Sequence, residues 1–197
     1  MVLLWAVLAG LITGWARARI RGHPYQAPEL QGVWLVLLAV LPQLFAFHIQ
    51  RTATIIPDHI ASLILVASQI ALLVFTAVNL DVPGFWALGL GLGANLAVIL
   101  ANGGWMPISP ETAALMYPDV PQEFWASGER FGNSKDLLIT VQDMRLGWLS
   151  DRFITPDWFP RRVAFSPGDI MIAIGAIWLL TAGGEEPPHT ESNNHSL

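Results

Sequence analysis

The feature that most constrains this chain is an apolar run over residues 60–79, which contains no Asp, Glu, Lys, Arg or His. One α-helical crossing of a bilayer needs about 20 such residues, whereas a surface helix of a soluble domain carries charges on its outer face. Four more apolar runs accompany it, at residues 2–20, 32–49, 85–101 and 168–182. The sequence therefore predicts an all-α integral membrane bundle of about five transmembrane helices.

The composition favours a chain that lies in lipid. Hydrophobic residues make up 53% of the sequence and charged residues 13%, against about 25% charged residues in an ordinary soluble domain. A formal net charge of −5 gives no basic surface for nucleic acid, so we expect the lipid bilayer and no nucleic acid as a partner. Because the chain has no cysteine, disulfides, thiolate catalysis and cysteine-bound metals are excluded.

The runs define one membrane domain over residues 1–182, followed by a polar tail at 183–197 with the composition of a disordered segment. A long connection, 102–167, separates the fourth and fifth runs and is expected to be partly helical. Three arginines follow the first run at positions 17, 19 and 21, and positive charge after the first helix favours the cytoplasmic side. We therefore expect a multi-pass protein of the cell membrane, with its N-terminus and residues 108–166 outside and those residues open to a membrane protein partner.

Small and polar residues recur at helical spacing inside the runs. A small residue stands at every fourth position in the first run (Ala6, Gly10, Gly14, Ala18) and in the fourth (Gly89, Gly93, Ala97, Ala101), which predicts close helix packing. Polar residues form one stripe in the third run (Ser62, Gln69, Thr76, Asn79) and another in the fourth (Asn95, Asn102). Because the turn at 80–84 is short, we expect the two stripes to face each other. Such a polar seam is either interhelical hydrogen bonding, at about 0.6 kcal/mol per bond, or a binding site.

The connection begins and ends with helix-capping signals. Asn102-Gly103-Gly104-Trp105-Met106-Pro107 predicts the end of a helix, and Ser109-Pro110 the start of another. Ser166 and Asp169 have the spacing of a capping box. The alternatives are that the two glycines let a ligand approach the backbone, and that Asp169 handles protons or a cation. Between these signals, residues 137–149 carry apolar side chains at helical spacing and predict a segment on the bilayer surface; the alternative is a cap folded over the helix bundle or a surface for a partner.

Three short strings of the sequence also resemble a family signature. Asn102-Gly103-Gly104-x-Met106-Pro107, Leu149-x-Asp151, and Ser166-x-Gly168-Asp169 with a later Gly175 are similar to the pattern of a bacterial multi-pass membrane family, domain of unknown function 5317. The resemblance covers residues 1–182 and implies a membrane fold. The family has no established activity, so the resemblance implies no reaction.

Three classes of function remain open. The first is a non-catalytic accessory subunit or scaffold. The alternative is a binder or transporter of a lipid, quinone or other small apolar molecule through the polar seam, which a deep cavity at Gln69, Asn95 and Asn102 would favour. An enzyme is the least supported, because no nucleophile–base pair, metal cluster or phosphate-binding loop is visible, and we expect no cofactor and no metal. The candidate ligand or partner site comprises Gln69, Asn95, Asn102, Gly103, Gly104, Met106, Pro107, Asp151 and Asp169.

Overall fold

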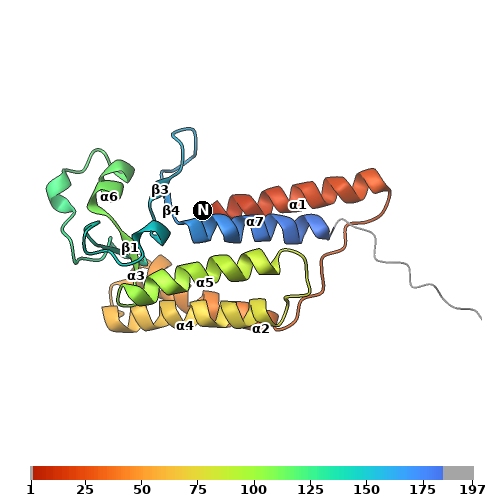
Figure 1. Ribbon diagram of the computed structural model, residues 1–197, viewed down its shortest axis with the longest axis horizontal. Coiled ribbons are helices and arrows are strands. Elements are labelled where there is room, and N and C mark those ends of the chain that lie inside the picture. The colour runs from red at the N-terminus through yellow and green to blue at the C-terminus, as the bar shows by residue number, and fades with distance from the viewer. Residues whose placement is uncertain (1, 184–197) are drawn as a thin grey trace, which may run out of the picture.

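The computed structural model describes residues 2–183 and is mostly helical. Five long helices lie along one axis and form the body of the molecule (Figure 1). They are α1 (Val2–Arg21), α2 (Val33–Gln43), α4 (Asp58–Ala77), α5 (Phe85–Ala101) and α7 (Pro167–Ala182). Each corresponds to one of the predicted apolar runs. The predicted polar tail, apart from Gly183, lies outside the described residues.

One of the five helices changes its hydrogen-bond pattern near its end. Pro42 lies inside α2, and a π-helix, Leu44–His48, continues it directly. Proline has no N–H and its ring crowds the preceding turn, so a regular α-helix is disturbed at such a residue. The short helix α3 (Gln50–Ala53) then leads into α4.

By length and composition, two of the five expected spans could cross a membrane, namely α1 and α4. The segment Val33–His48, α5 and α7 are also apolar, but they are shorter, with 17 residues in α5 and 16 in α7. In α1 and α4 only 22% of the most apolar window is buried inside the molecule. Most residues of these windows in α1 and α4 therefore lie outside the buried core of the molecule.

The long helices form an open series. Helix α1 packs against α7, α7 against α5, α5 against α4, and α4 against α2. Helices α4 and α5 are joined by the predicted short turn, in which Gly84 has a φ of 90°. The two ends of the series, α1 and α2, have at most marginal contact with each other within the described residues.

Glycines allow the closest approaches in this series. The small-residue face predicted for α1 is its buried face: Ala6, Gly10, Gly14 and Ala18. The same prediction for α5 is wrong, because Ala97 is exposed and a Cβ at Gly93 would meet nothing within 4 Å. Helix α5 instead presents another face to α7, where Gly91 lies against Gly168.

Residues 102–166 fold into a cap over one end of the helices (Figure 1). Its elements are β1 (Met106–Ile108), α6 (Pro110–Met116), β2 (Asp136–Leu138), β3 (Phe153–Ile154) and β4 (Ala164–Phe165), with 3-10 turns at Gln122–Phe124 and Gly147–Leu149. Strands β1 and β2 pair in parallel, and β3 and β4 pair antiparallel. Ser109 caps α6 as predicted, because its hydroxyl accepts a hydrogen bond from the Thr112 N–H at 3.1 Å. Ile108, Ala113 and Leu138 form the buried core of the cap.

The helical spacing over residues 137–149 does not correspond to a helix. Its first residues belong to β2, and turns follow up to the 3-10 turn at Gly147–Leu149. Two constraints from outside the segment explain the difference: β2 pairs with β1, and the side chain of Asn102 holds the backbone of Arg145. Tertiary contacts therefore override the local periodicity.

Candidate functional site

A cavity of about 390 Å³ lies between the long helices, and all five contribute to its wall. This volume is within the range of small-molecule sites in proteins. Most of the lining side chains are Leu, Val, Ile, Phe and Met. The polar ones are Gln43, Gln69, Thr76, Asn95, Lys135 and Asp169. The wall is thus apolar with a small number of polar groups, as in sites that orient an apolar ligand.

The cap places Lys135 in this cavity through the parallel pairing of β1 and β2. The Met106 N–H donates to the Lys135 carbonyl at 3.1 Å, and Met106 lies opposite Asp136 in the register. The Asn-Gly-Gly turn sets the direction of β1, since Gly103 and Gly104 have φ of 72° and 89°. These are left-handed values that favour glycine. Met106 and Lys135 therefore meet at the cap end of the cavity.

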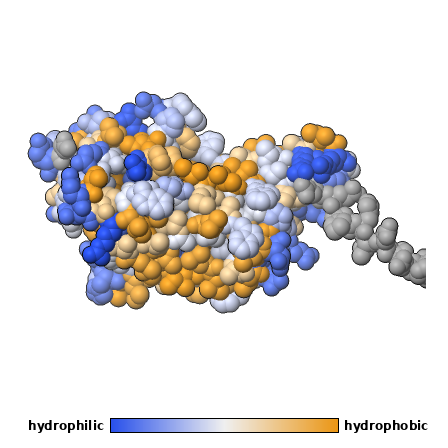
Figure 2. Space-filling view, viewed as in Figure 1, coloured by the Kyte–Doolittle hydropathy of each residue, from blue (hydrophilic) through white to orange (hydrophobic). Residues whose placement is uncertain are grey.

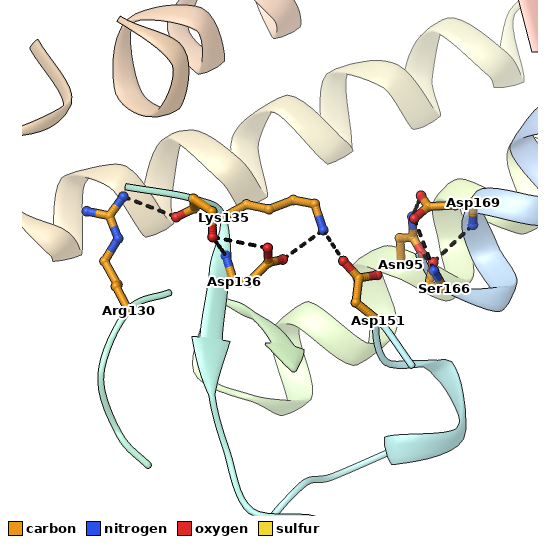
Figure 3. A network of polar contacts seen from close by, with 8 residues as sticks. Asn95, Arg130, Lys135, Asp136, Asp151, Ser166 and Asp169 are labelled. Atoms are coloured by element: carbon orange, nitrogen blue, oxygen red, sulfur yellow. Dashed lines mark hydrogen bonds and ion pairs between the residues drawn. The ribbon is translucent and has the colours of Figure 1, made fainter. Parts of the chain in front are cut away.

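The Lys135 ammonium lies between two carboxylates, as Figure 3 shows. It donates to Asp151 Oδ2 at 2.7 Å and to Asp136 Oδ1 at 2.9 Å. The side chain of Asp151 is only 3% exposed, whereas that of Lys135 keeps 38%. Because Lys135 lines the cavity, we attribute its remaining exposure to that space. We call Lys135, Asp136 and Asp151 the lysine group.

Burial and charge act in opposite directions on this group. Burial lowers the pKa of the Lys135 ammonium, but the charges of Asp136, Asp151 and Asp169 outweigh it and raise the pKa above its ordinary value. Burial also raises the pKa of the Asp151 carboxyl to about 8, because the ion pair with Lys135 offsets only part of the desolvation cost. Lys135 is therefore protonated at neutral pH, and Asp151 can gain or lose a proton near it.

A second polar group lies next to the first, at the start of α7 (Figure 3). Ser166 and Asp169 form the predicted capping box: the Asp169 N–H donates to Ser166 Oγ at 3.0 Å, and the Ser166 N–H donates to Asp169 Oδ2 at 3.1 Å. Asn95 of α5 completes it. Its Nδ2 donates to Asp169 Oδ1 at 3.0 Å, and its Oδ1 accepts from Ser166 Oγ at 2.9 Å. We call these three residues the Asp169 group.

The predicted pairing of Gln69 with Asn95 is therefore wrong, because Asn95 turns to α7 and not to α4. Gln69 lines the cavity, and its buried Oε1 has no hydrogen-bond partner in the described structure. Asn79 also turns away from α5, since it binds the backbone of Gln31 at 2.8 and 2.9 Å. Of the two alternatives for the polar seam, a direct hydrogen bond between Gln69 and Asn95 is not formed, and both residues line a cavity.

The predicted site residues divide into two sets. Gln69, Asn95, Met106 and Asp169 line the cavity, and Asp151 contacts it through Lys135. Asn102, Gly103, Gly104 and Pro107 support the cap instead. Asn102 Nδ2 donates to the Arg145 carbonyl at 2.7 Å, the Gly104 carbonyl accepts from Ser62 Oγ at 3.1 Å, and the Pro107 carbonyl accepts from the Asp151 N–H at 3.2 Å.

Sequence reasoning missed Lys135, Asp136 and Gln43. Lys135 lies in the connection, far from any apolar run, so helical periodicity could not assign it to the bundle. One signal was available: Lys135 is the only lysine of the sequence, beside nine arginines. In the described part of the chain, no group of three or more His, Asp or Glu side chains could hold a metal ion.

Comparison with known proteins places the chain in a family. A model described as a family of unknown function, DUF5317, matches residues 28–181, a range that includes Gln69, Lys135 and Asp169. Neither the curated proteins nor the solved structures gave a match. Because the matched range is most of the sequence, the chain belongs to this family of unknown function, DUF5317.

Proposed function

We propose that this protein is a multi-pass membrane protein that binds a small, largely apolar molecule of the bilayer between its long helices. The observation that carries this proposal is the cavity, with its apolar wall and its few polar groups. A scaffold held together by interhelical hydrogen bonds would close the space between α4 and α5. Here Gln69 lines the cavity, and its buried Oε1 has no hydrogen-bond partner among the described residues.

The outer surface of the helices supports a place in the membrane. Figure 2 shows an apolar band over the helices, with hydrophilic residues at the cap and at the opposite end. Large apolar side chains are exposed on the long helices, among them Ile12 of α1 at 65%, Leu63 of α4 at 63% and Leu90 of α5 at 59%. A water-soluble monomer rarely exposes more than a few hundred Å² of contiguous apolar surface. A bilayer would cover this band.

The open series of helices offers a route from the lipid to the cavity. Leu3 of α1 and both Val36 and Val40 of α2 line the cavity, and α1 and α2 are the two ends of the series. A ligand dissolved in the bilayer could therefore enter between α1 and α2 without crossing the cap. This route suits a molecule that partitions into lipid.

Mass spectrometry of the protein purified in a mild detergent tests the proposal. We expect one or a few amphiphiles to co-purify with it in amounts well above their share of the membrane. Leu72→Trp adds a large side chain inside the cavity and should remove them. Leu63→Trp makes the same change on the outer face of the same helix and should retain them.

A purified, folded protein with no enriched molecule would contradict the proposal. So would equal retention by both tryptophan variants, because the bound molecule would then lie outside the cavity.

A further inference from the structure

The cavity also indicates the chemistry of its ligand, an inference that rests on the proposed function. We propose that the ligand joins an apolar body to a head group that donates hydrogen bonds and carries no negative charge, such as a hydroxyl, an amide N–H or an amine. Three observations lead to this class: an unpaired acceptor, the balance of charges, and the position of the polar groups along the helices.

The first observation is a buried oxygen without a donor. Gln69 Oε1 is buried and has no hydrogen-bond partner among the described residues. A buried acceptor left unpaired costs roughly 1–3 kcal/mol, and most such atoms in folded proteins have a partner. Gln69 lines the cavity, so a rotation of its side-chain amide would bring this oxygen to a ligand N–H or O–H, which would supply the missing donor.

The second observation is the charge at the cap end. One ammonium, that of Lys135, lies among the carboxyl groups of Asp136, Asp151 and Asp169, whose charges all act on it. Lys135 is the only basic residue among the described residues of the wall, and two carboxylates already accept from it. An anionic head group would add another negative charge without a free cation to balance it, and such unbalanced charge is costly away from water.

One donor remains available in the same place. An ammonium has three N–H groups, and Asp136 and Asp151 take two of those of Lys135. A ligand head group could accept from the third. A head that combines a donor with an acceptor therefore suits this end of the cavity.

The third observation is that the lining of the cavity changes from polar near the cap to apolar away from it. Lys135 reaches it from the cap, and Asp169 stands in the first turn of α7 next to the cap. Phe75 near the end of α4 and Leu88 near the start of α5 line the opposite part. Thr76 is also there, but its hydroxyl donates to the Leu72 carbonyl of its own helix at 2.7 Å. The head of the ligand is therefore directed to the cap and its apolar body away from it.

Three photoreactive probes with one common alkyl chain test this class on the purified protein in lipid nanodiscs. Their heads are a primary alcohol, its methyl ether and a sulfonate, which stays anionic at any working pH. We expect the alcohol to label peptides of α4 and α5 about tenfold more than the sulfonate, and several-fold more than the ether, which cannot donate.

Two variants connect the result to the proposed contact. Gln69→Leu should lower labelling by the alcohol to the level of the ether. It should also fold, because the lost Oε1 has no partner within the described protein. Thr13→Val on α1 removes a hydroxyl that donates to the Ala9 carbonyl of its own helix at 2.8 Å and lies outside the cavity wall, so it should leave alcohol labelling unchanged.

The outcomes separate this inference from the proposed function. Equal labelling by alcohol and ether would overturn the requirement for a donor, and sulfonate labelling equal to that of the alcohol would overturn the exclusion of negative charge. In both cases the cavity would still bind an apolar molecule. If no probe labels α4 or α5, the proposed function itself fails, and this inference fails with it.

Discussion

Asp151 is the residue at which burial and charge oppose each other most directly. Its side chain is 3% exposed and its carboxyl has a pKa of about 8, raised by burial and only partly restrained by Lys135. In the unfolded chain the same carboxyl ionises near its ordinary pKa of about 4. Between these two values the folded protein binds more protons than the unfolded one. Its stability should therefore decrease as the pH rises from about 4 to about 8.

Thermal unfolding in detergent at a series of pH values measures this effect. We expect Asp151→Asn to remove a slope of up to about 1.4 kcal/mol per pH unit in that window, because asparagine does not titrate. Asp157→Asn changes an aspartate whose side chain is 84% exposed and should leave the slope as it is. A slope that persists in Asp151→Asn would show that Asp151 is ionised at neutral pH in the folded protein.

At the scale of the elements, the contact between α5 and α7 depends on glycines. A Cβ at Gly175 would lie 2.7 Å from the Gly84 carbonyl oxygen and 2.7 Å from the Leu88 nitrogen, both of which are backbone atoms. Gly175→Ala should therefore destabilise the protein by about 1–3 kcal/mol, since the helices must move apart.

Gly93→Ala is the matched control on α5, because a Cβ there meets nothing within 4 Å. It should be neutral, or stabilising by up to about 1 kcal/mol through helix propensity alone. Unfolding temperatures of the two variants in one detergent give the comparison. Equal losses in both would contradict close packing at Gly175.

The helices themselves could be predicted from the sequence, but their partners could not. Each apolar run is long enough to determine a helix, and Ser109 and Ser166 begin α6 and α7 through local hydrogen bonds. A helical stripe, in contrast, defines a face without saying which helix lies opposite. Asn95 is therefore expected against Gln69 and is found against Asp169. The outcome depends on Gly91 and Gly168, which let the backbones of α5 and α7 approach closely and so bring Asn95 to Asp169.

At the scale of the whole molecule, the cap was the least predictable part. Strands of three residues are too short for a period-two pattern, and β1 and β2 pair across a long stretch of sequence. Yet this pairing brings Lys135 to the cavity. The site therefore combines helix positions that periodicity can indicate with a lysine that only the fold of the connection can place.

The arrangement of the helices makes one prediction for the molecule as a whole. The cap and the start of α1 lie at one end, and the turn between α4 and α5 lies at the other, with the end of α1 and its arginines (Figure 1). Positive charge after the first helix favours the cytoplasmic side, so the cap should lie outside. The chain has no cysteine, so a single introduced cysteine reports its own location. In intact cells a membrane-impermeant maleimide should label Glu129→Cys in the cap and should not label Asp81→Cys in the turn.

Both positions are exposed, so a difference between them reflects the membrane and not burial. Asp81→Cys should become reactive once the cells are permeabilised, which shows that its thiol is present and accessible from the inner side. The reverse labelling pattern would mean that the protein has the opposite orientation in the membrane, with the cap in the cytoplasm and the cavity unchanged. Labelling of both cysteines in intact cells would contradict the separation of the two ends by a bilayer. The apolar band in Figure 2 would then need a protein partner to cover it.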